Sequence, residues 1–387
     1  MSNPLARRAW LKLAGIGVLG AGVGLPRLGA QTVGVGAVEP VPPEGKHINL
    51  AGNENPFGPA PAVVQAIFRA APHSSRYPFR EEQVLKEMLA EKEGVGVENI
   101  VLGNGCDELL AMVAAEFFRA AGVCELVVTE PTYFQLPDYA AKLGAIIRRV
   151  PHQTATMRHD LRAMTAAVGD ATRLVYVCNP DNPSGTCVGG AELAAFCREI
   201  APRCAVFIDE VYLELLDDYA AQTQVPLVRA GLPVIVARSF SKLHGMAGHR
   251  IGYAVTTPQL AAALARWQMT GLNFIGVAAA RASLGEPAFL AYSTRKIREG
   301  RVRFCALLEE IGLGYTPSHG NFVFHQIGMP VGDYQAAMKA RGILVGWPHS
   351  PPDAYKDWCR TSIGTEAEMA KHSVAMREVI STARGKS

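Results

Sequence analysis

Continuous apolar runs of strand length constrain the fold of this chain more than any other feature of its sequence. Three such runs are RLVYVC at residues 173–178, AVFI at 205–208 and VIVA at 234–237. A helical pattern occupies residues 190–200, between the first two runs. Strands without polar alternation are typical of a parallel sheet that helices cover on both faces. The sequence therefore predicts an α/β fold with a doubly wound, mostly parallel sheet.

The pattern changes near residue 280, where a long helical stretch begins at about 288 and runs to 310. Two short strand candidates follow at 322–324 and 343–345, with a helical segment between them. We expect a large domain of residues 71–279 and a smaller α+β domain of residues 280–387. Residues 31–70 are expected to form an N-terminal arm.

The first 30 residues differ from the rest of the chain. Arg7 and Arg8 precede Trp10, a glycine-rich apolar run follows, and small residues end the segment at Ala30. This pattern resembles a twin-arginine export signal and is too short and glycine-rich for a stable membrane span. We expect export, for instance to a periplasm, with no membrane attachment after signal cleavage. The alternatives are a hydrophobic anchoring helix and a cytoplasmic protein.

Composition and cysteine spacing exclude several classes of protein. A hydrophobic fraction of 49% with 19% charged residues is typical of a well-buried globular protein. A formal charge of +3 gives no support for a nucleic-acid partner. The eight cysteines include no C-x-x-C pair, and several lie in apolar runs. We interpret them as small buried side chains and expect no metal site.

Lys242 lies in the run VARSFSKLHGMAGHRIGY, between a small apolar strand and a glycine-rich turn. A lysine in such a place can act as a nucleophile that forms a Schiff base with an aldehyde. If the aldehyde is pyridoxal phosphate, its phosphate needs hydroxyls, backbone N–H groups and a cation. Its ring nitrogen needs a carboxylate, and its ring oxygen needs hydrogen-bond donors.

The sequence offers a candidate for each of these needs, at the ends of predicted strands or the starts of predicted helices. The candidates for the phosphate are Ser239, Ser241, Arg250, Gly105, Cys106 and Asp107. Asp209 ends the strand AVFI and is the candidate carboxylate, while Asn182 and Tyr212 are candidate donors to the ring oxygen.

Each candidate has an ordinary explanation when it is taken alone. Gly103-Asn104-Gly105 could open a dinucleotide loop, although the third glycine of that motif is absent. Asp209 could be a helix N-cap, Asn182 a turn residue and Lys242 a surface lysine. Their joint order along the chain favours the cofactor site.

The order of these motifs resembles that of the class I and II aminotransferases, which are pyridoxal-phosphate-dependent enzymes of fold type I. Within them, the histidinol-phosphate aminotransferase group is the most similar. The matching runs extend from about residue 46 to the end of the chain, and they read NLAGNENPFGP, SRYP, NIVLGNGCDELL, EPTYF, NPDNPSGT, FIDEVY, RSFSKLHGMAGHRIGY, HGNFVF and CRTSIGT.

The resemblance implies roles for residues around the cofactor ring. Lys242 would form the Schiff base and then move the proton between the substrate Cα and the cofactor as general base. Asp209 would pair with the ring nitrogen. Asn182 and Tyr212 would bond the ring oxygen, and Tyr133 would stack on the ring face or, alternatively, only pack in the core.

The resemblance also implies how the anionic groups are held. Ser239, Ser241 and Arg250 would bind the cofactor phosphate together with the N–H groups of residues 105–107. Tyr77 would reach that phosphate from the other subunit of a homodimer. Arg360 and Asn53 would bind substrate, with Arg360 as a clamp for a carboxylate; a surface salt bridge is the alternative.

The chain departs from the resemblance at one place. Histidinol-phosphate enzymes commonly carry a second arginine after the strand that corresponds to residues 342–345, and this arginine helps to bind the substrate phosphate. Here the place is taken by Gly346 and Trp347. Trp347 would line a more apolar substrate pocket or pack within the small domain, and both interpretations stay open.

The leading hypothesis is therefore an aminotransferase that moves an amino group between an amino acid, or a histidinol-phosphate-like amine, and a 2-oxo acid. A decarboxylase, racemase or lyase on the same scaffold is the second hypothesis, because the sequence does not set which Cα bond is broken. A non-catalytic binding protein is the third, and the joint presence of Lys242, Asp209 and Arg250 argues against it.

Overall fold

The computed structural model describes residues 47–119, 122–346 and 353–385 of the chain. The predicted export signal and Trp347 lie outside these ranges. The strands are β1 (Ile48–Leu50), β2 (Ile100–Gly103), β3 (Glu125–Glu130), β4 (Ile146–Pro151), β5 (Thr172–Cys178), β6 (Ala205–Asp209), β7 (Val234–Ser239), β8 (Gly252–Val255), β9 (Phe322–Gln326), β10 (Ile343–Val345) and β11 (Trp358–Ser362).

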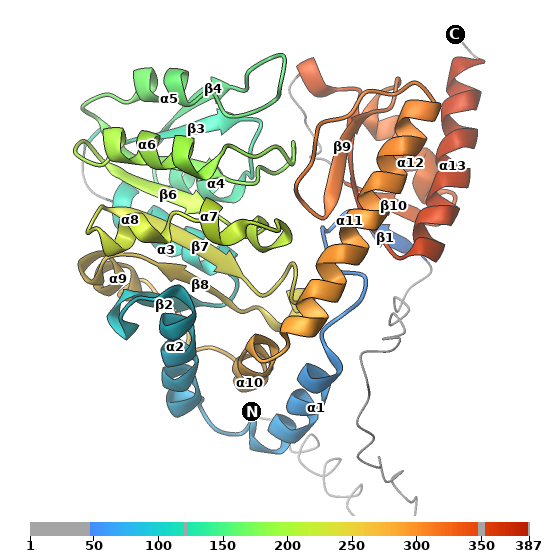
Figure 1. Ribbon diagram of the computed structural model, residues 1–387. Helices are drawn as coiled ribbons and strands as arrows, with labels where there is room; N and C mark the ends of the chain where they lie inside the picture. The colour runs from blue at the N-terminus through green and yellow to red at the C-terminus, as the bar shows by residue number, and fades with distance from the viewer. Residues whose placement is uncertain (1–46, 120–121, 347–352, 386–387) are drawn as a thin grey trace, which may run out of the picture. The chain divides into compact units, whose positions relative to one another are not determined.

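The α-helices alternate with these strands over most of the described chain (Figure 1). They are α1 (Pro61–Ala70), α2 (Phe79–Glu93), α3 (Cys106–Phe118), α4 (Gln135–Lys142), α5 (Leu161–Ala167), α6 (Gly190–Ile200), α7 (Tyr219–Gln222), α8 (Val225–Arg229), α9 (Pro258–Ala265), α10 (Phe274–Leu284), α11 (Pro287–Glu310), α12 (Val331–Lys339) and α13 (Glu366–Arg384).

Seven strands form one central sheet in the order β2-β8-β7-β6-β5-β3-β4. Strand β8 runs antiparallel to both of its neighbours, and the other pairs are parallel. This sheet confirms the predicted α/β class with a mostly parallel sheet. Because β2 and β7 both pair antiparallel with β8, their carboxyl ends lie at the same edge as those of β3, β5 and β6.

The two faces of the sheet are buried in separate cores, as the apolar runs predict. On β5, Val175 and Val177 belong to one core, and Leu174 and Tyr176 belong to the other. The first core includes side chains from α2, α6 and α10, and the second includes side chains from α3, α4 and α9. Each of these four strand residues is fully buried, so the strand needs no polar face.

The C-terminal part has its own core among α11, α12 and α13 and two small sheets (Figure 1). Strands β9 and β11 pair antiparallel, and β1 pairs parallel with β10. Helix α13 begins with a capping box, in which Thr365 Oγ1 accepts from Glu368 N at 3.2 Å and Thr365 N donates to Glu368 Oε2 at 2.7 Å.

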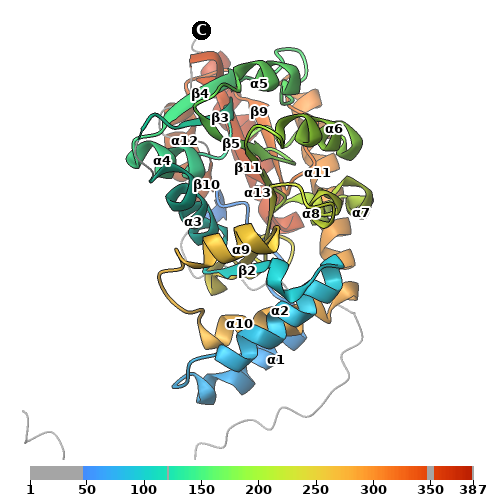
Figure 2. The same ribbon diagram turned by 90° about the vertical axis from the view of Figure 1, so that its left-hand side faces the viewer.

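Two of the predicted domain limits can be compared with the observed helices and strands. The boundary near residue 280 falls within α10, and β1, from the predicted arm, joins a sheet with the C-terminal strand β10. Figure 2 shows α1, α2 and α10 lying together beside the central sheet. The division into an arm and two domains stays a prediction.

Candidate active site

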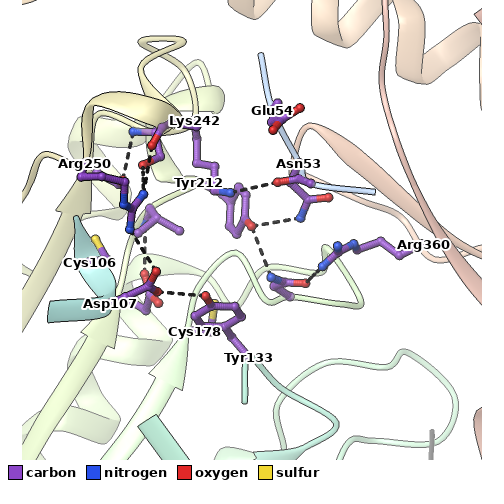
Figure 3. A pocket seen from close by; sticks show the side chains of 17 residues that line it. Asn53, Glu54, Cys106, Asp107, Tyr133, Cys178, Tyr212, Lys242, Arg250 and Arg360 are labelled. Carbon is purple, nitrogen blue, oxygen red and sulfur yellow. Dashed lines mark hydrogen bonds and ion pairs between the residues drawn. The ribbon is translucent and has the colours of Figure 1, made fainter. Parts of the chain in front are cut away.

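A cavity of about 240 Å³ opens at the carboxyl edge of the central sheet (Figure 3). Ligands of open α/β sheets bind at this edge, because loops from neighbouring strands converge there. Most of the residues predicted from the sequence line this cavity: Asn53, Cys106, Asp107, Tyr133, Asn182, Asp209, Tyr212, Ser239, Ser241, Lys242, Arg250 and Arg360. Residues from seven separate segments of the chain thus face one space.

Lys242 follows β7 by three residues, and its amine is held at the cavity wall. Its Nζ lies 3.4 Å from the carbonyl oxygen of Gly52 and 5.6 Å from the centre of the Tyr212 ring. Burial and the positive charge of Arg360 lower the pKa of Lys242 to about 8. A larger fraction of this amine is therefore neutral near pH 7.5 than for an exposed lysine, and only the neutral amine is a nucleophile.

Asp209 is the last residue of β6 and is 2% exposed. One carboxylate oxygen accepts from Tyr176 Oη at 3.2 Å, and the other accepts from Val211 N at 3.3 Å. Burial raises the pKa of Asp209 to about 6, although these hydrogen bonds oppose the rise. A cationic N–H in the cavity would stabilise the ionised carboxylate, and the protonated ring nitrogen of pyridoxal phosphate is a group of this kind.

The residues expected to hold the phosphate surround the start of α3. Arg250 Nη2 lies 3.0 Å from Asp107 Oδ2, and Arg250 Nη1 lies 3.5 Å from Ser241 Oγ. Gly105 has φ +76°, and a Cβ there would lie 2.3 Å from Arg250 Nη2. A side chain at this positive φ would be strained and would push the guanidinium away from the first turn of the helix, where N–H groups and the helix dipole attract an anion. These residues fit a phosphate group.

A hydrogen-bond network connects the ring side of the cavity with Arg360 on β11. Tyr212 Oη accepts from Asn53 Nδ2 at 3.0 Å and from Asn182 Nδ2 at 3.3 Å. Arg360 Nη1 donates to Asn182 Oδ1 at 2.7 Å, and Nη2 donates to the carbonyl of Ala51 at 2.6 Å. The buried Nε of Arg360 has no partner among the described residues. An anionic substrate group would supply the missing acceptor.

Gly346, at the departure from the family pattern, has a structural role. Its backbone pairs with that of Arg360 in both directions, at 2.9 and 2.8 Å. A Cβ at this position would lie 2.9 Å from Arg360 Nη2 and 2.8 Å from the carbonyl of Ala51. The glycine therefore leaves room for the hydrogen bond between Arg360 and Ala51.

Tyr133 and Tyr77, both predicted to contact the cofactor, differ in position. Tyr133 lies at the cavity, and its hydroxyl donates to Asp107 Oδ1 at 3.0 Å. Tyr77 is 80% exposed, stacks on Phe79 at a centroid distance of 5.6 Å and does not line the cavity of its own chain. Its predicted role across a dimer interface stays a prediction.

Several residues of the site were missed by sequence reasoning. Tyr176 was interpreted only as part of an apolar strand, yet its hydroxyl donates to Asp209. Ser362 Oγ accepts from Asn53 N at 2.9 Å and donates to Asn53 Oδ1 at 3.0 Å, and this holds Asn53 at φ +51°. Glu54 also lines the cavity. The position of Ser362 two residues after Arg360 on one strand was the available signal, since such residues share a face.

Known proteins share this fold and these motifs. Residues 45–375 match the family of class I and II aminotransferases. The histidinol-phosphate aminotransferase of Moorella thermoacetica is 36% identical over 335 residues, which are 86% of this chain and 85% of the relative. That of Halalkalibacterium halodurans is 33% identical over 337 residues, with coverages of 86% and 89%.

A solved structure gives the same result. The crystal structure of histidinol-phosphate aminotransferase from Sinorhizobium meliloti, in complex with pyridoxal-5′-phosphate, matches with a TM-score of 0.79 at 32% identity. The match covers 87% of this chain and 91% of that chain. The chain therefore belongs to the family of class I and II aminotransferases, and it is a pyridoxal-phosphate-dependent aminotransferase.

Proposed function

We propose that this enzyme moves an amino group between an amino acid, or a histidinol-phosphate-like amine, and a 2-oxo acid, with Lys242 as the proton carrier. One observation carries the proposal: Lys242, Asp209 and Arg360 face a single cavity of about 240 Å³. When bound there, pyridoxal phosphate supplies an aldehyde that accepts the amino group and a cationic ring that withdraws electrons.

The chain's own residues divide the work of proton transfer. Lys242 Nζ would hold the cofactor aldehyde and, once the substrate amine has displaced it, would carry the proton that leaves the substrate Cα. Its lowered pKa favours this role, since a base with a pKa near the working pH both accepts and donates readily. Asp209 would keep the ring nitrogen of the bound cofactor protonated.

Arg360 is proposed to bind the anionic group of the substrate. Its Nη1 and Nη2 are fixed by Asn182 and Ala51, which leaves the buried Nε as a free donor of a planar fork. A carboxylate fits this donor, and so does a phosphate. The names of the relatives favour an amine that carries a phosphate, whereas Gly346 favours a substrate with a single anionic group, because no arginine stands at that position.

We also propose a homodimer in which Tyr77 reaches the cofactor phosphate of the partner subunit. Tyr77 and Phe79 are 80% and 72% exposed and stack on each other, and an apolar pair of this kind favours a protein interface. Light scattering on the holoenzyme tests the assembly. A variant Tyr77→Phe should retain the dimer and bind pyridoxal phosphate more weakly.

Export by the twin-arginine route is a further proposal, based on Arg7, Arg8 and the small residues that follow. Among the residues that the structure describes, no helix is long and apolar enough to cross a membrane. A route for folded proteins would let the enzyme bind its cofactor before export. Fractionation of cells that express the wild type and an Arg7→Lys, Arg8→Lys variant tests the proposal, and loss of the exported form is expected.

The experiment for the reaction is a panel of amino acids and histidinol phosphate, each added alone to the purified holoenzyme. A true donor should convert the bound cofactor to pyridoxamine phosphate, with loss of its visible absorbance. A 2-oxo acid should then restore that absorbance. A donor that releases carbon dioxide or changes its Cα configuration without this cycle would favour a decarboxylase or a racemase instead.

A further inference from the structure

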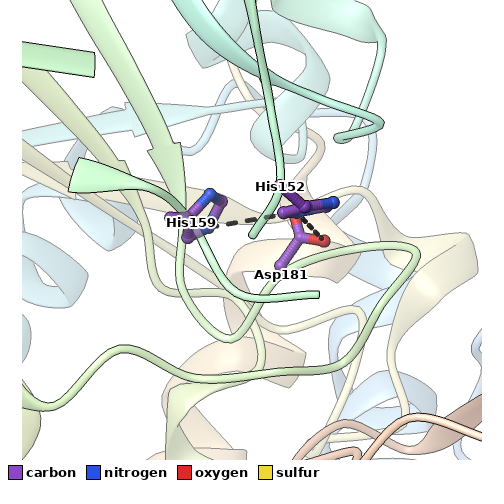
Figure 4. A group of neighbouring side chains, drawn as sticks. All are labelled: His152, His159 and Asp181. Carbon is purple, nitrogen blue, oxygen red and sulfur yellow. Dashed lines mark ion pairs between the residues drawn. The ribbon is translucent and has the colours of Figure 1, made fainter. Parts of the chain in front are cut away.

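His152, His159 and Asp181 form a buried cluster (Figure 4). None of the three lines the cavity. His152 directly follows β4, and Asp181 follows β5 by three residues. Because β4, β3 and β5 are adjacent parallel strands, their carboxyl ends bring these side chains together. One nitrogen of each histidine and one oxygen of Asp181 all lie within 4.8 Å of one another.

Asp181 is an ionised group that the protein holds without access to water. Its carboxylate accepts from Ser184 Oγ at 2.7 Å, from Ser184 N at 3.2 Å and from Thr132 Oγ1 at 3.1 Å. Burial alone would raise the pKa of Asp181, but its contacts with His152 and His159 and the hydrogen bond from Ser184 lower it. Such a charge needs a partner inside the protein.

His152 is the side chain placed to be that partner. Its Nε2 lies 3.4 Å from Asp181 Oδ2, and its side chain is fully buried. Neither of its ring nitrogens has a hydrogen-bond partner among the described residues. The imidazole thus faces Asp181 with no competing hydrogen bond among the described residues, and its ring also lies beside that of His159 at a centroid distance of 5.6 Å.

Both ring nitrogens of His159 have hydrogen-bond partners outside the cluster, and this argues against a metal site. Its Nε2 lies 2.7 Å from the carbonyl oxygen of Cys178, and its Nδ1 lies 2.7 Å from Thr129 Oγ1. A carbonyl can only accept, so Nε2 carries the hydrogen and has no free lone pair for a cation. His152 and Asp181 alone are then two ligands, whereas zinc takes four.

Asp181 shapes the loop that presents Asn182 to the site. Its N–H donates to the carbonyl of Thr186 at 2.9 Å, and its own carbonyl accepts from Gly185 N at 2.9 Å. The side-chain bonds to Ser184 close the same loop. The adjacent Asn182 contacts Arg360 at 2.7 Å and Tyr212 at 3.3 Å. The geometry of Asn182 therefore depends on how Asp181 is anchored.

We propose that Asp181 and His152 form a buried positioning pair that aims Asn182 and, through it, Arg360 at the substrate's anionic group. The proposal rests on the proposed role of Arg360. Neither residue of the pair lines the cavity, so the pair would act through Asn182. Loss of the pair should chiefly weaken substrate binding, because a small displacement of a positioning group is enough to cost affinity.

The test uses the holoenzyme and the best amino donor from the panel. Asp181→Asn removes the negative charge of the pair. His152→Leu removes the side chain that faces Asp181, and His152→Gln replaces the imidazole by an amide that can still donate a hydrogen bond to Asp181. His372→Leu is the matched control, since His372 is also fully buried with both ring nitrogens unpartnered among the described residues, but it lies on α13.

Two readouts separate positioning from a general loss of stability. One is the KM and kcat for the donor. The other is the dissociation constant of the donor's α-methyl analogue, which binds but has no Cα proton to lose. The absorbance of the bound cofactor reports this binding. A merely less stable enzyme has less active protein and an unchanged KM. Thermal unfolding of each variant accounts for that effect.

We expect Asp181→Asn to raise the KM and the analogue's dissociation constant by about tenfold or more. His152→Leu should raise both less, His152→Gln should recover part of the loss, and the control should change neither. If Asp181→Asn does not fold, the dissociation constants of the two His152 variants test the proposal. Unchanged dissociation constants in the variants that fold would overturn the proposal, as would stoichiometric zinc in the wild type that His152→Leu loses.

Arg360→Ala distinguishes this proposal from the proposed function on which it rests. If Arg360→Ala leaves the dissociation constant unchanged, the proposed function of Arg360 is wrong. If it raises that constant while the Asp181 and His152 variants do not, only the positioning pair is wrong. In the Arg360→Ala background, Asp181→Asn should add little, because both changes act on the same contact.

Discussion

Replacement of Asp209 by asparagine should make the cofactor-free protein more stable and the holoenzyme much slower. The amide keeps an oxygen that can accept from Tyr176 or Val211, and it removes a buried charge. The pKa of Asp209 rises from 3.8 to about 6 on folding because of burial. At ~1.4 kcal/mol per pH unit, ionised Asp209 costs the folded apoprotein about 3 kcal/mol.

The sign of this effect fixes its pH dependence. Below about pH 4 the carboxyl is protonated in both the folded and the unfolded protein, so the charge costs nothing. Between about pH 4 and pH 6 the unfolded chain ionises first, and the wild-type apoprotein loses stability as the pH rises. Above about pH 6 the cost is constant. The advantage of Asp209→Asn should therefore grow between about pH 4 and pH 6 and then level off.

Thermal unfolding of the apoproteins at several pH values is the assay. About 3 kcal/mol corresponds to a rise in Tm of ~4 °C for a protein of this size at pH 8. Asp170→Asn, a change at an exposed position, serves as the control and should leave the Tm unchanged. An Asp209→Asn apoprotein that is less stable than the wild type at pH 8 would refute the reasoning. With cofactor bound, the same variant should lose at least about 100-fold in turnover, since the ring nitrogen loses its counter-charge.

Three further predictions test other parts of the site. Gly105→Ala should weaken pyridoxal phosphate binding by at least about tenfold, because its Cβ would lie 2.3 Å from Arg250 Nη2. Gly122→Ala is the control and should not weaken binding, because this glycine also has a positive φ but no atom within 4 Å of an added Cβ. Equilibrium dialysis measures the cofactor affinity of both variants. Lys242→Ala should remove the visible band of the bound cofactor and all turnover, and a retained band would contradict its role. Cofactor capture by wild-type apoenzyme should speed up as the pH rises through about 8, where half of Lys242 Nζ is neutral, and should level off only at a pH well above that value. Stopped-flow absorbance records this rate, and a rate that falls with pH would be contrary to the lowered pKa.

The central strands were predictable from the sequence, and the edge strand β4 was not. Strands β5, β6 and β7 are buried on both faces, so their residues form continuous apolar runs. Strand β4 lies at one edge of the sheet and is largely exposed, so its sequence IIRRVP carries no such run. The antiparallel direction of β8 could not be predicted from the apolar pattern either, because a buried strand has the same composition in either direction.

The site was predictable where one motif carries one role, and less so where two distant segments meet. Lys242, Asp209 and Arg250 stand in motifs whose order points to one cofactor. The contact between Asn53 and Ser362 joins residues 309 positions apart, and neither residue signals the other in the sequence. The pairing of β1 with β10 is of the same kind, since three residues near the start of the described chain gain a partner strand only through the folded structure.

The covalent role of Lys242 is tested most directly by borohydride reduction of the holoenzyme followed by peptide mass spectrometry. Reduction makes the bond between the lysine and the cofactor permanent. We predict that the peptide containing Lys242 carries the mass of the reduced cofactor and that no other lysine does. A cofactor attached to a different lysine, or a holoenzyme from which reduction traps no cofactor at all, would contradict the central claim.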